Sequence, residues 1–197
     1  MSAAQRIGIL GGSFDPPHAA HTTMAVSARE TLGLARVLLV PAPLPPHKEP
    51  SRLTPYALRL EMLEAAVEGL EGVVVAPLEE GREGPSYTVD LLRAFRAAHP
   101  RDDIYFIVGA DSLRDLGSWR DPEGVLASCT LAVFPREGVD TALAVPGPAS
   151  VVVFESPLVP ISSTDIRARA RAGASLAGLV APAVEEIIRS RGLYADG

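Results

Sequence analysis

The fold of this chain is decided by the stretch RIGILGGSFDPPHAAH at residues 6–21. A short apolar run leads directly into Gly11 and Gly12, and a segment with helical spacing begins near His18. Two glycines at a strand end let the backbone turn sharply and approach a ligand, and the start of the following helix favours an anion at the same place. Because His18 and His21 are three residues apart, their imidazoles lie on one face of the first helical turn. The stretch therefore predicts a strand, a phosphate-binding turn and a helix in succession.

The rest of the chain repeats this alternation of strand and helix. Six runs rich in Val, Ile and Leu, apolar on both faces, predict parallel strands covered by helices on each side. They lie at 6–10, 36–40, 73–76, 104–108, 131–134 and 151–154. Helical spacing is found at 18–32, 55–68, 87–98, 122–127, 164–172 and 182–191. The pattern predicts an α/β fold with a doubly wound, Rossmann-like parallel sheet in a three-layer α/β/α arrangement, in which ligands bind at the carboxyl ends of the strands.

Local signals support three of the helix starts. Thr54 and Asp121 each place a capping oxygen before a proline, and Pro182 opens the last helix, which Gly192 ends. Two irregular stretches lie between the predicted elements. The first, 41–53, holds five prolines and is predicted to face the substrate, whereas the pattern leaves the role of 136–150 undecided.

Composition limits the kinds of protein that this chain can be. With 197 residues, 47% of them apolar, it can bury one core, so residues 1–197 are expected to form a single domain. The net charge of −6 argues against a general cationic surface for nucleic acid or an anionic membrane. A lone cysteine, Cys129, excludes an internal disulfide and a zinc-binding cysteine cluster. No run resembles a signal peptide or a membrane span of ~20 residues, so a cytoplasmic protein with a local anion site is expected.

A second motif, ISSTDIR, lies at residues 161–167. Three hydroxyls and an arginine at a helix start offer donors that can hold phosphate at two points, although alone they are more typical of a helix cap with a surface arginine. The first stretch alone could likewise be a tight turn with surface histidines. Neither the dinucleotide fingerprint G-x-G-x-x-G nor the P-loop G-x-x-x-x-G-K-[ST] is present. Together the two motifs favour a phosphate site of another kind.

Residues 11–21 closely resemble the GG[TS]FDPxHxGH signature, and residues 161–167 the ISSTxIR signature, of the nucleotidyltransferase superfamily of adenylyl- and cytidylyltransferases. Within it the chain resembles the bacterial nicotinate-nucleotide adenylyltransferases. Four further segments follow that family's order, and with the signatures they cover most of the chain: 45–48, 85–88, 109–112 with Trp119, and 132–136. The resemblance implies a nucleotidyltransferase-type fold and transfer of the adenylyl group of ATP to nicotinate mononucleotide in NAD biosynthesis, with Mg²⁺ as cofactor.

Two alternatives remain beside this interpretation. One is a phosphopantetheine adenylyltransferase, but that resemblance implies a shorter chain with Thr at the position of His18. The histidine pair and the SYT and GADS segments also argue against it. A nucleotide-binding sensor without turnover is the other. Only Ala20 favours the sensor alternative, because its methyl group lies where the signature has glycine and could tighten the approach of the helix to the nucleotide.

The resemblance also assigns roles to residues. His18 and His21 are expected to be catalytic, donating hydrogen bonds to the ATP phosphates and to the charge that develops during transfer. Residues expected at ATP are Gly11, Gly12, Ser13, Phe14, Gly109, Asp111, Ile161, Ser162, Ser163, Thr164 and Arg167. Residues expected at nicotinate mononucleotide are Lys48, Ser86, Tyr87, Thr88, Asp111, Trp119 and Arg136.

Simpler interpretations compete with several of these roles. Core packing is the alternative for Trp119, a helix cap for Asp111, and simple solvation for Lys48. His47 and His99 receive no role beyond surface or cap positions. Mg²⁺ is expected to be bound through the ATP phosphates and not by protein ligands, and homo-oligomerisation is left open.

Overall fold

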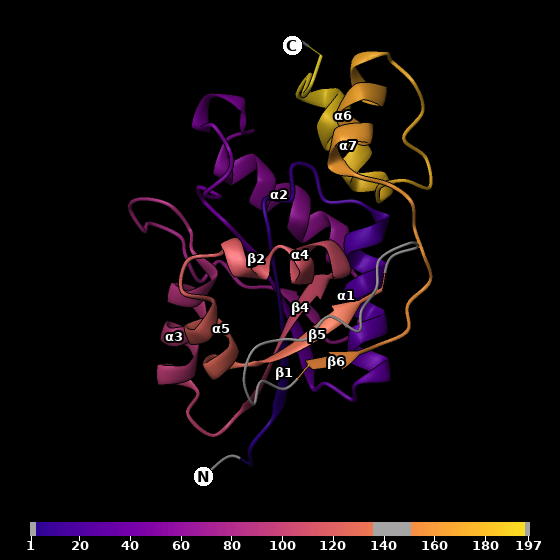
Figure 1. Cartoon of the computed structure of the whole chain (residues 1–197). Coiled ribbons are helices and arrows are strands. Elements are labelled where there is room, and N and C mark those ends of the chain that lie inside the picture. The colour runs from indigo at the N-terminus through magenta and orange to yellow at the C-terminus, as the bar shows by residue number, and fades with distance from the viewer. Residues whose placement is uncertain (1–2, 136–150, 196–197) are drawn as a thin grey trace.

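The computed structural model describes residues 3–135 and 151–195 of the chain. Its centre is a six-stranded sheet with the order β3-β2-β1-β4-β5-β6, in which every pairing is parallel (Figure 1). The strands are β1 (Arg6–Gly12), β2 (Arg36–Pro41), β3 (Val73–Val75), β4 (Asp103–Gly109), β5 (Thr130–Phe134) and β6 (Val151–Val153). Strand order reverses between β1 and β4, which is the switch point where doubly wound folds bind ligands. The predicted fold class is confirmed.

Seven α-helices connect and follow the strands in the described part of the chain. They are α1 (Ala19–Thr31), α2 (Tyr56–Val67), α3 (Thr88–Ala98), α4 (Ala110–Arg114), α5 (Pro122–Ser128), α6 (Ser163–Arg171) and α7 (Pro182–Ser190), with the 3-10 turns η1 (Pro50–Arg52) and η2 (Leu116–Ser118). Every predicted helix is present, and α4 is an additional one.

The predicted caps are partly correct. Asp121 Oδ1 accepts from Gly124 N at 2.9 Å, and Pro182 opens α7, as expected. Thr54 does not cap α2, which begins at Tyr56 without a side-chain cap. Its backbone is held by tertiary contacts instead, since Thr54 N donates to the carboxylate of Asp15.

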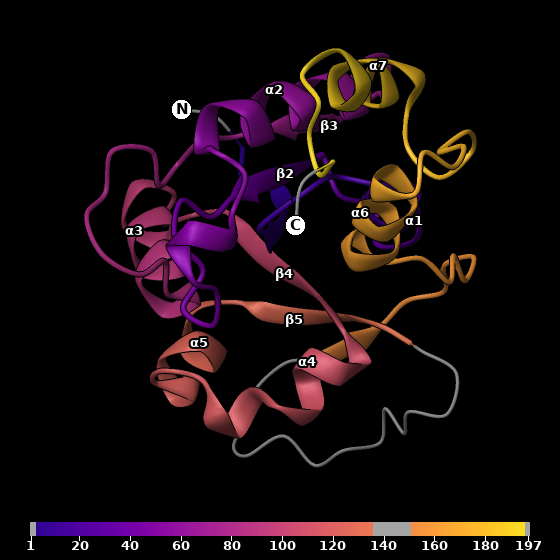
Figure 2. The same cartoon turned by 90° about the horizontal axis from the view of Figure 1, so that it is seen from above.

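The helices cover both faces of the sheet and create two core layers. On one face, Ile9 of β1 is buried in a cluster with Phe95 of α3. On the other face, the next residue, Leu10, is buried in a cluster with Ala25 of α1 and Leu63 of α2. Figure 2 shows α3 and α5 on one side of the sheet and α1 on the other. This burial of successive strand residues explains why the strands are apolar on both faces.

A third cluster joins the C-terminal helices to α2. It contains Met62 of α2, Ile166 of α6, and Val184 and Ile188 of α7, all nearly inaccessible to solvent. Figure 1 shows α6 and α7 together beyond one end of the sheet, and Figure 2 shows α7 beside α2. We refer to residues 163–194 as the C-terminal hairpin.

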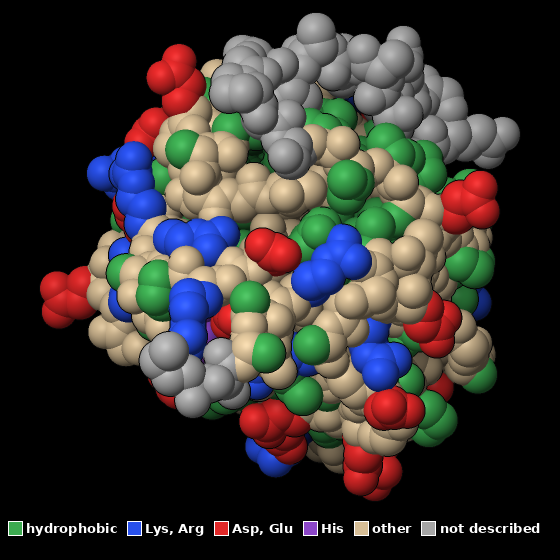
Figure 3. Space-filling model, turned by 90° about the horizontal axis from the view of Figure 1, so that it is seen from below, with side chains coloured by type: hydrophobic (Ala, Val, Ile, Leu, Met, Phe, Trp, Pro, Cys, Tyr) green, Lys and Arg blue, Asp and Glu red, His purple; other side chains and the backbone are tan. Residues whose placement is uncertain are grey.

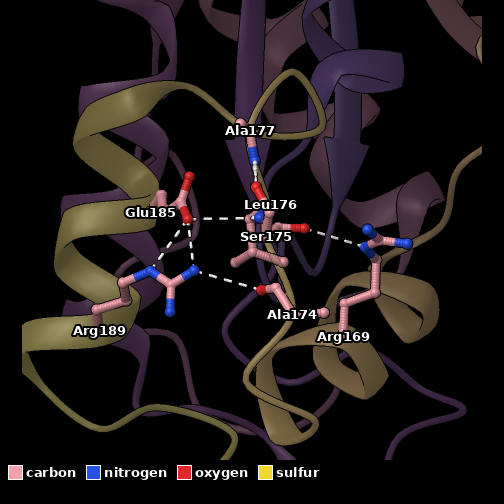
Figure 4. Close-up of polar contacts among 7 residues, drawn as sticks. All are labelled: Arg169, Ala174, Ser175, Leu176, Ala177, Glu185 and Arg189. Atoms are coloured by element: carbon pink, nitrogen blue, oxygen red, sulfur yellow. Dashed lines mark hydrogen bonds and ion pairs between the residues drawn. The ribbon is translucent and has the colours of Figure 1, made fainter.

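Polar contacts hold the turn between α6 and α7 (Figure 4). Arg189 Nη2 donates to Glu185 Oε1 at 2.7 Å and to the carbonyl of Ala174 at 3.3 Å. Arg169 Nε donates to the carbonyl of Ser175 at 3.1 Å. Each helix therefore binds the turn through its own arginine, and the turn fixes the two helices relative to one another.

The surface carries charges of both signs. On the face seen from below in Figure 3, the acidic and basic side chains of the described residues are interspersed with apolar ones and do not gather into one broad basic region. No helix among residues 3–135 and 151–195 is long and apolar enough to cross a membrane.

Candidate active site

The turn after β1, residues 11–18, is called the phosphate loop below. Gly11 and Gly12 close β1 and line a cavity of about 390 Å³ together with Ser13. A Cβ atom on Gly12 would lie 3.1 Å from the ring of Phe14, so a side chain there would have to displace that ring. Phe14 is buried and has a φ of 46°, a left-handed conformation that is strained for a bulky residue. Such strain is concentrated at functional sites.

Two histidines meet at the start of α1. His18 is the N-cap residue, and its ring stacks on that of His21 with centroids 3.8 Å apart and planes inclined by 27°. His18 N donates to His21 Nδ1 at 3.2 Å. Because Nδ1 accepts this bond, the proton of the neutral His21 ring is on Nε2. The prediction that both imidazoles share one face of the first turn is confirmed.

The environment of His21 keeps this ring neutral. Burial, followed by the neighbouring His18, lowers the pKa of His21 well below its ordinary value. His21 also lines the 390 Å³ cavity with the two glycines. At neutral pH it is therefore a neutral donor, through Nε2, at a site where helix N–H groups and glycine amides favour an anion.

The C-terminal hairpin binds the phosphate loop directly. Asp15 is buried, and its Oδ1 accepts from Tyr194 Oη at 2.7 Å while its backbone oxygen accepts from Arg167 Nη1 at 2.7 Å. Ser163 Oγ donates to the carbonyl of Pro16 at 2.9 Å. Burial and the Asp15 carboxylate raise the pKa of Tyr194, so the phenol remains a donor. The two sequence motifs thus lie in contact although they are far apart in the chain.

Within the second motif, most polar groups have partners inside the protein. Ser162 caps α6, since its Oγ accepts from Asp165 N at 3.2 Å and its own N–H donates to Asp165 Oδ2 at 2.9 Å. Arg167 Nη2 donates to Thr164 Oγ1 at 3.1 Å. Ile161 packs partly against the third core cluster. The cap interpretation of this motif is confirmed for Ser162, and direct contact of these side chains with ATP stays a prediction.

A second, larger cavity of about 710 Å³ adjoins the first. The residues that line both cavities are Pro46, His47, Ser86, Thr88, Ser112 and Trp119. Because these walls are shared, the cavities form one cleft, which we call the substrate cleft. Each part has a volume typical of small-molecule sites, so the cleft can hold two ligands side by side.

The start of α3 lies where the two parts of the cleft meet. Tyr87 is the N-cap residue, and its side chain makes no capping hydrogen bond to the helix. The preceding Ser86 N donates to the carbonyl of Leu44 at 2.8 Å, which ties this helix start to the loop after β2. The first N–H groups of α3 and its positive dipole end are suited to an anion. The predicted helix start at this position is confirmed.

Aromatic rings form another wall. Trp119 contacts the Phe106 ring edge to face, with centroids 6.3 Å apart, packs against the core and also lines both cavities. Core packing and a place beside the ligand are therefore compatible for this residue. The guanidinium of Arg120 lies 4.5 Å from the centre of the Tyr87 ring and 3.7 Å from the Asp90 carboxylate.

Several expected ATP residues lie together in the cleft. Gly11, Gly12, Ser13, His21 and Gly109 all line the smaller cavity. Buried His18 and Phe14 do not line it, but both rings contact the ring of His21.

Other expected residues lie elsewhere. Asp111 is not an N-cap, because Gly109 caps α4, and its carboxylate faces Arg114 at 3.5 Å. Lys48 is exposed and does not line either cavity in the described part of the chain. Arg136 lies outside the described residues.

The structure adds residues for which no function was predicted. His47 was expected only at the surface, yet it lines both cavities, and its position beside Lys48 in the proline-rich loop could have indicated this. Glu79 is a buried carboxylate in the smaller cavity, and burial raises its pKa although Arg82 Nη1 lies 3.4 Å away. The role of Tyr194 depends on a contact between distant segments, so no local signal reveals it.

Comparisons with known proteins show the family to which the chain belongs. The family model described as cytidylyltransferase-like matches residues 9–169. A relative from Thermus thermophilus is 44% identical over 189 residues, which cover 96% of this chain and 99% of the relative. A relative from Geobacter sulfurreducens is 38% identical over 215 residues, which cover 98% of this chain and 100% of the relative. Both carry the name "Probable nicotinate-nucleotide adenylyltransferase".

A solved structure supports the fold independently. The nicotinic acid mononucleotide adenylyltransferase of Plasmodium falciparum, complexed with NaAD, superposes with a TM-score of 0.82 over 98% of both chains, at 21% identity. At this identity the likeness establishes the fold. The family model and the full-length relatives add the sequence evidence, and the chain therefore belongs to the cytidylyltransferase-like nucleotidyltransferases and, within them, to the nicotinate-nucleotide adenylyltransferase family.

Proposed function

We propose that the chain transfers the adenylyl group of ATP to nicotinate mononucleotide, giving nicotinate adenine dinucleotide and pyrophosphate, in NAD biosynthesis. The observation that carries this proposal is the stacked His18 and His21 pair at the start of α1, of which His21 lines a cleft that continues to the start of α3. Full-length relatives with this name support the choice of substrates. The single six-stranded sheet supports one nucleotidyltransferase domain over residues 1–197.

The reaction needs positioning more than it needs a protein nucleophile. An oxygen of the acceptor phosphate forms a bond to the α-phosphorus of ATP, the bond from that phosphorus to the bridging oxygen breaks, and pyrophosphate leaves with the electron pair. Because the acceptor oxygen is already anionic, alignment of the two substrates and stabilisation of the developing charge can supply most of the rate.

The histidine pair is assigned to that developing charge. Neutral His21 presents Nε2–H because its Nδ1 accepts from His18 N. In the proposal, His21 donates to an ATP phosphate oxygen, and His18 acts with it from the same helix start. A rigid donor of this kind stabilises the transition state without reorganising during the reaction.

The remaining ATP contacts follow the smaller cavity. The backbone of Gly11, Gly12, Ser13 and Phe14 would approach the phosphates, and Gly109 and Asp111 after β4 would lie near the ribose or the phosphates. The second motif, 161–167, would border the adenosine and the phosphate tail while it holds the phosphate loop.

Mg²⁺ would enter with ATP. Residues 3–135 and 151–195 contain no cluster of three or more His, Cys, Asp or Glu side chains that could hold a metal ion. A cation bound mainly by phosphate oxygens and water suits such a site, since Mg²⁺ commonly takes one or two carboxylates at most and substrate oxygens for the rest. When bound, it would neutralise negative charge on the phosphates.

The larger cavity is assigned to nicotinate mononucleotide. Its ring carboxylate would meet the first N–H groups of α3 at Tyr87 and Thr88, and Trp119 would lie beside the ring. Lys48 and Arg136 remain candidates for the acceptor phosphate.

Pyrophosphate release on mixing the protein with ATP, Mg²⁺ and nicotinate mononucleotide tests the proposal, with the dinucleotide product identified by mass. Release that depends on both substrates is expected. If ATP binds but no product forms with any pyridine mononucleotide, the chain is a nucleotide sensor, and the proposal is wrong.

A further inference from the structure

Arg59 of α2 is a buried arginine whose hydrogen bonds, within the described part of the chain, all go to backbone oxygens. Its guanidinium also lies 5.4 Å from the centre of the Tyr56 ring. Nε donates to Thr54 O at 2.9 Å, Nη1 to Ser13 O at 2.7 Å and Ala42 O at 2.8 Å, and Nη2 to Pro43 O at 2.9 Å. Its exposed fraction is 1%, and no carboxylate of the described residues lies within ion-pair distance of it. Arginine is seldom buried without such a partner, so this one is held by its four carbonyls.

The four carbonyls belong to two segments that border the substrate cleft. Ser13 is in the phosphate loop, and the other three residues belong to the loop 42–54, which also contributes Pro46 and His47 to both parts of the cleft. Arg59 is therefore a direct link between the proposed ATP side and the proposed acceptor side.

The bond to Ser13 also orients the phosphate loop. In a trans peptide the carbonyl and the following N–H point in opposite directions. Because Ser13 O accepts from buried Arg59, the N–H of Phe14 points away from Arg59. The charged guanidinium makes these bonds stronger than neutral ones.

We infer that Arg59 is a positioning residue for the reaction, because it fixes the phosphate loop and the acceptor-side loop in one arrangement so that the two substrates meet in line. This inference rests on the proposed function. Arg59 does not line either cavity, so it acts through the loops that it holds.

A purely structural brace is the alternative, and the chain offers a matched control for it. Arg96 of α3 also binds the carbonyls of two separate segments, Asp102 O at 2.6 Å and Ser128 O at 3.2 Å, and it does not line either cavity. Replacing either arginine by lysine keeps the charge but removes the planar fork of donors. The pair therefore separates a loss of stability, common to both, from a loss of positioning.

The test compares wild type, Arg59→Lys and Arg96→Lys by thermal unfolding, steady-state kinetics with both substrates, and calorimetric titration with ATP. Kinetics are recorded well below each melting temperature. We expect Arg59→Lys to lower kcat about tenfold to a hundredfold, the effect of a misplaced reacting group, and to weaken ATP binding. Arg96→Lys should keep both near wild type and lose less Tm, because Arg96 is only partly buried and makes two such bonds.

Equal kcat and equal ATP affinity in the two variants would overturn the inference. If Arg59→Lys does not fold, Arg59→Gln is measured instead, and failure of both to fold would show a requirement of the fold and not of the site. If the wild type released no pyrophosphate, the proposed function would be wrong. The ATP titration would still show whether Arg59 positions the ATP side of the cleft or only stabilises the fold.

Discussion

Two substitutions of His21 separate its two nitrogens. Asparagine places an acceptor oxygen near the position of Nδ1, so His21→Asn can still accept from His18 N but has no donor at the position of Nε2. Glutamine reaches the position of Nε2 with its amide nitrogen, so His21→Gln keeps a donor but leaves His18 N without its acceptor. Both variants lose the ring stacking on His18 equally, so their difference isolates donation from capping.

The two variants are expected to differ in opposite ways in activity and in stability. Loss of one donor aimed at the developing charge should lower kcat of His21→Asn by about 10²–10³. Loss of the capping bond should lower the stability of His21→Gln by about 1 kcal/mol, or roughly 2–4 °C in Tm for a chain of this size. We therefore expect the asparagine variant to be the more stable and the glutamine variant to be the more active.

Pyrophosphate release at saturating substrates measures kcat, and thermal unfolding followed by circular dichroism measures Tm. His18→Ala serves as the reference for loss of the pair. If His21→Asn retained near-normal kcat while His21→Gln did not, the ring would serve the helix start and not the phosphates, and the assignment of a donor role would be refuted.

Four further outcomes are expected. Arg167→Ala should raise the KM for ATP about tenfold or more, since a charge-assisted contact is lost, with a smaller effect on the acceptor; equal effects in steady-state kinetics would make Arg167 structural. Nicotinate mononucleotide should be preferred over its amide by about tenfold to a hundredfold in kcat/KM, because the amide NH₂ would face the donors at Thr88; equal values would overturn the carboxylate site. The lowered pKa of His21 means that the unfolded chain binds more protons below pH 6.5, so Tm should fall as the pH drops from that value, and by less in His21→Asn; identical slopes would contradict the neutral ring. Burial raises the pKa of Cys129 to about 12, so the native thiol should resist iodoacetamide at pH 8 and react after unfolding, as mass spectrometry can show; rapid native labelling would contradict its burial.

The fold was predictable because the sheet leaves a strong pattern in the sequence. Strands buried on both faces must be apolar throughout, and each of the six apolar runs corresponds to a strand. The end of β1 was missed by two residues because Gly11 and Gly12 have no side chains to continue the pattern, although both pair with β2. Helix α4 was missed because five residues, Ala110–Arg114, are too few to show a helical period.

The site was predictable only where its chemistry is local. The histidine pair and the start of α3 are short strings in which spacing determines geometry, and both lie where they were expected. Arg59 has the appearance of a surface residue on a helix, and its burial depends on carbonyls up to 46 residues away. Thr54 resembled a helix cap, but tertiary bonds to Asp15 and Arg59 determine its conformation. Such contacts are set by the assembled fold, which a local pattern does not contain.

The bond between Asp15 and Tyr194 spans 179 residues and has a consequence for synthesis of the protein. A ribosome makes Asp15 long before Tyr194, so the nascent chain can form the sheet and the histidine helix while the carboxylate still lacks its phenol. The phosphate loop can reach its final form only after the C-terminal hairpin has emerged and docked. Removal of the Tyr194 phenol, or a bulky group that displaces it, would therefore act on the phosphate loop across 179 residues of sequence.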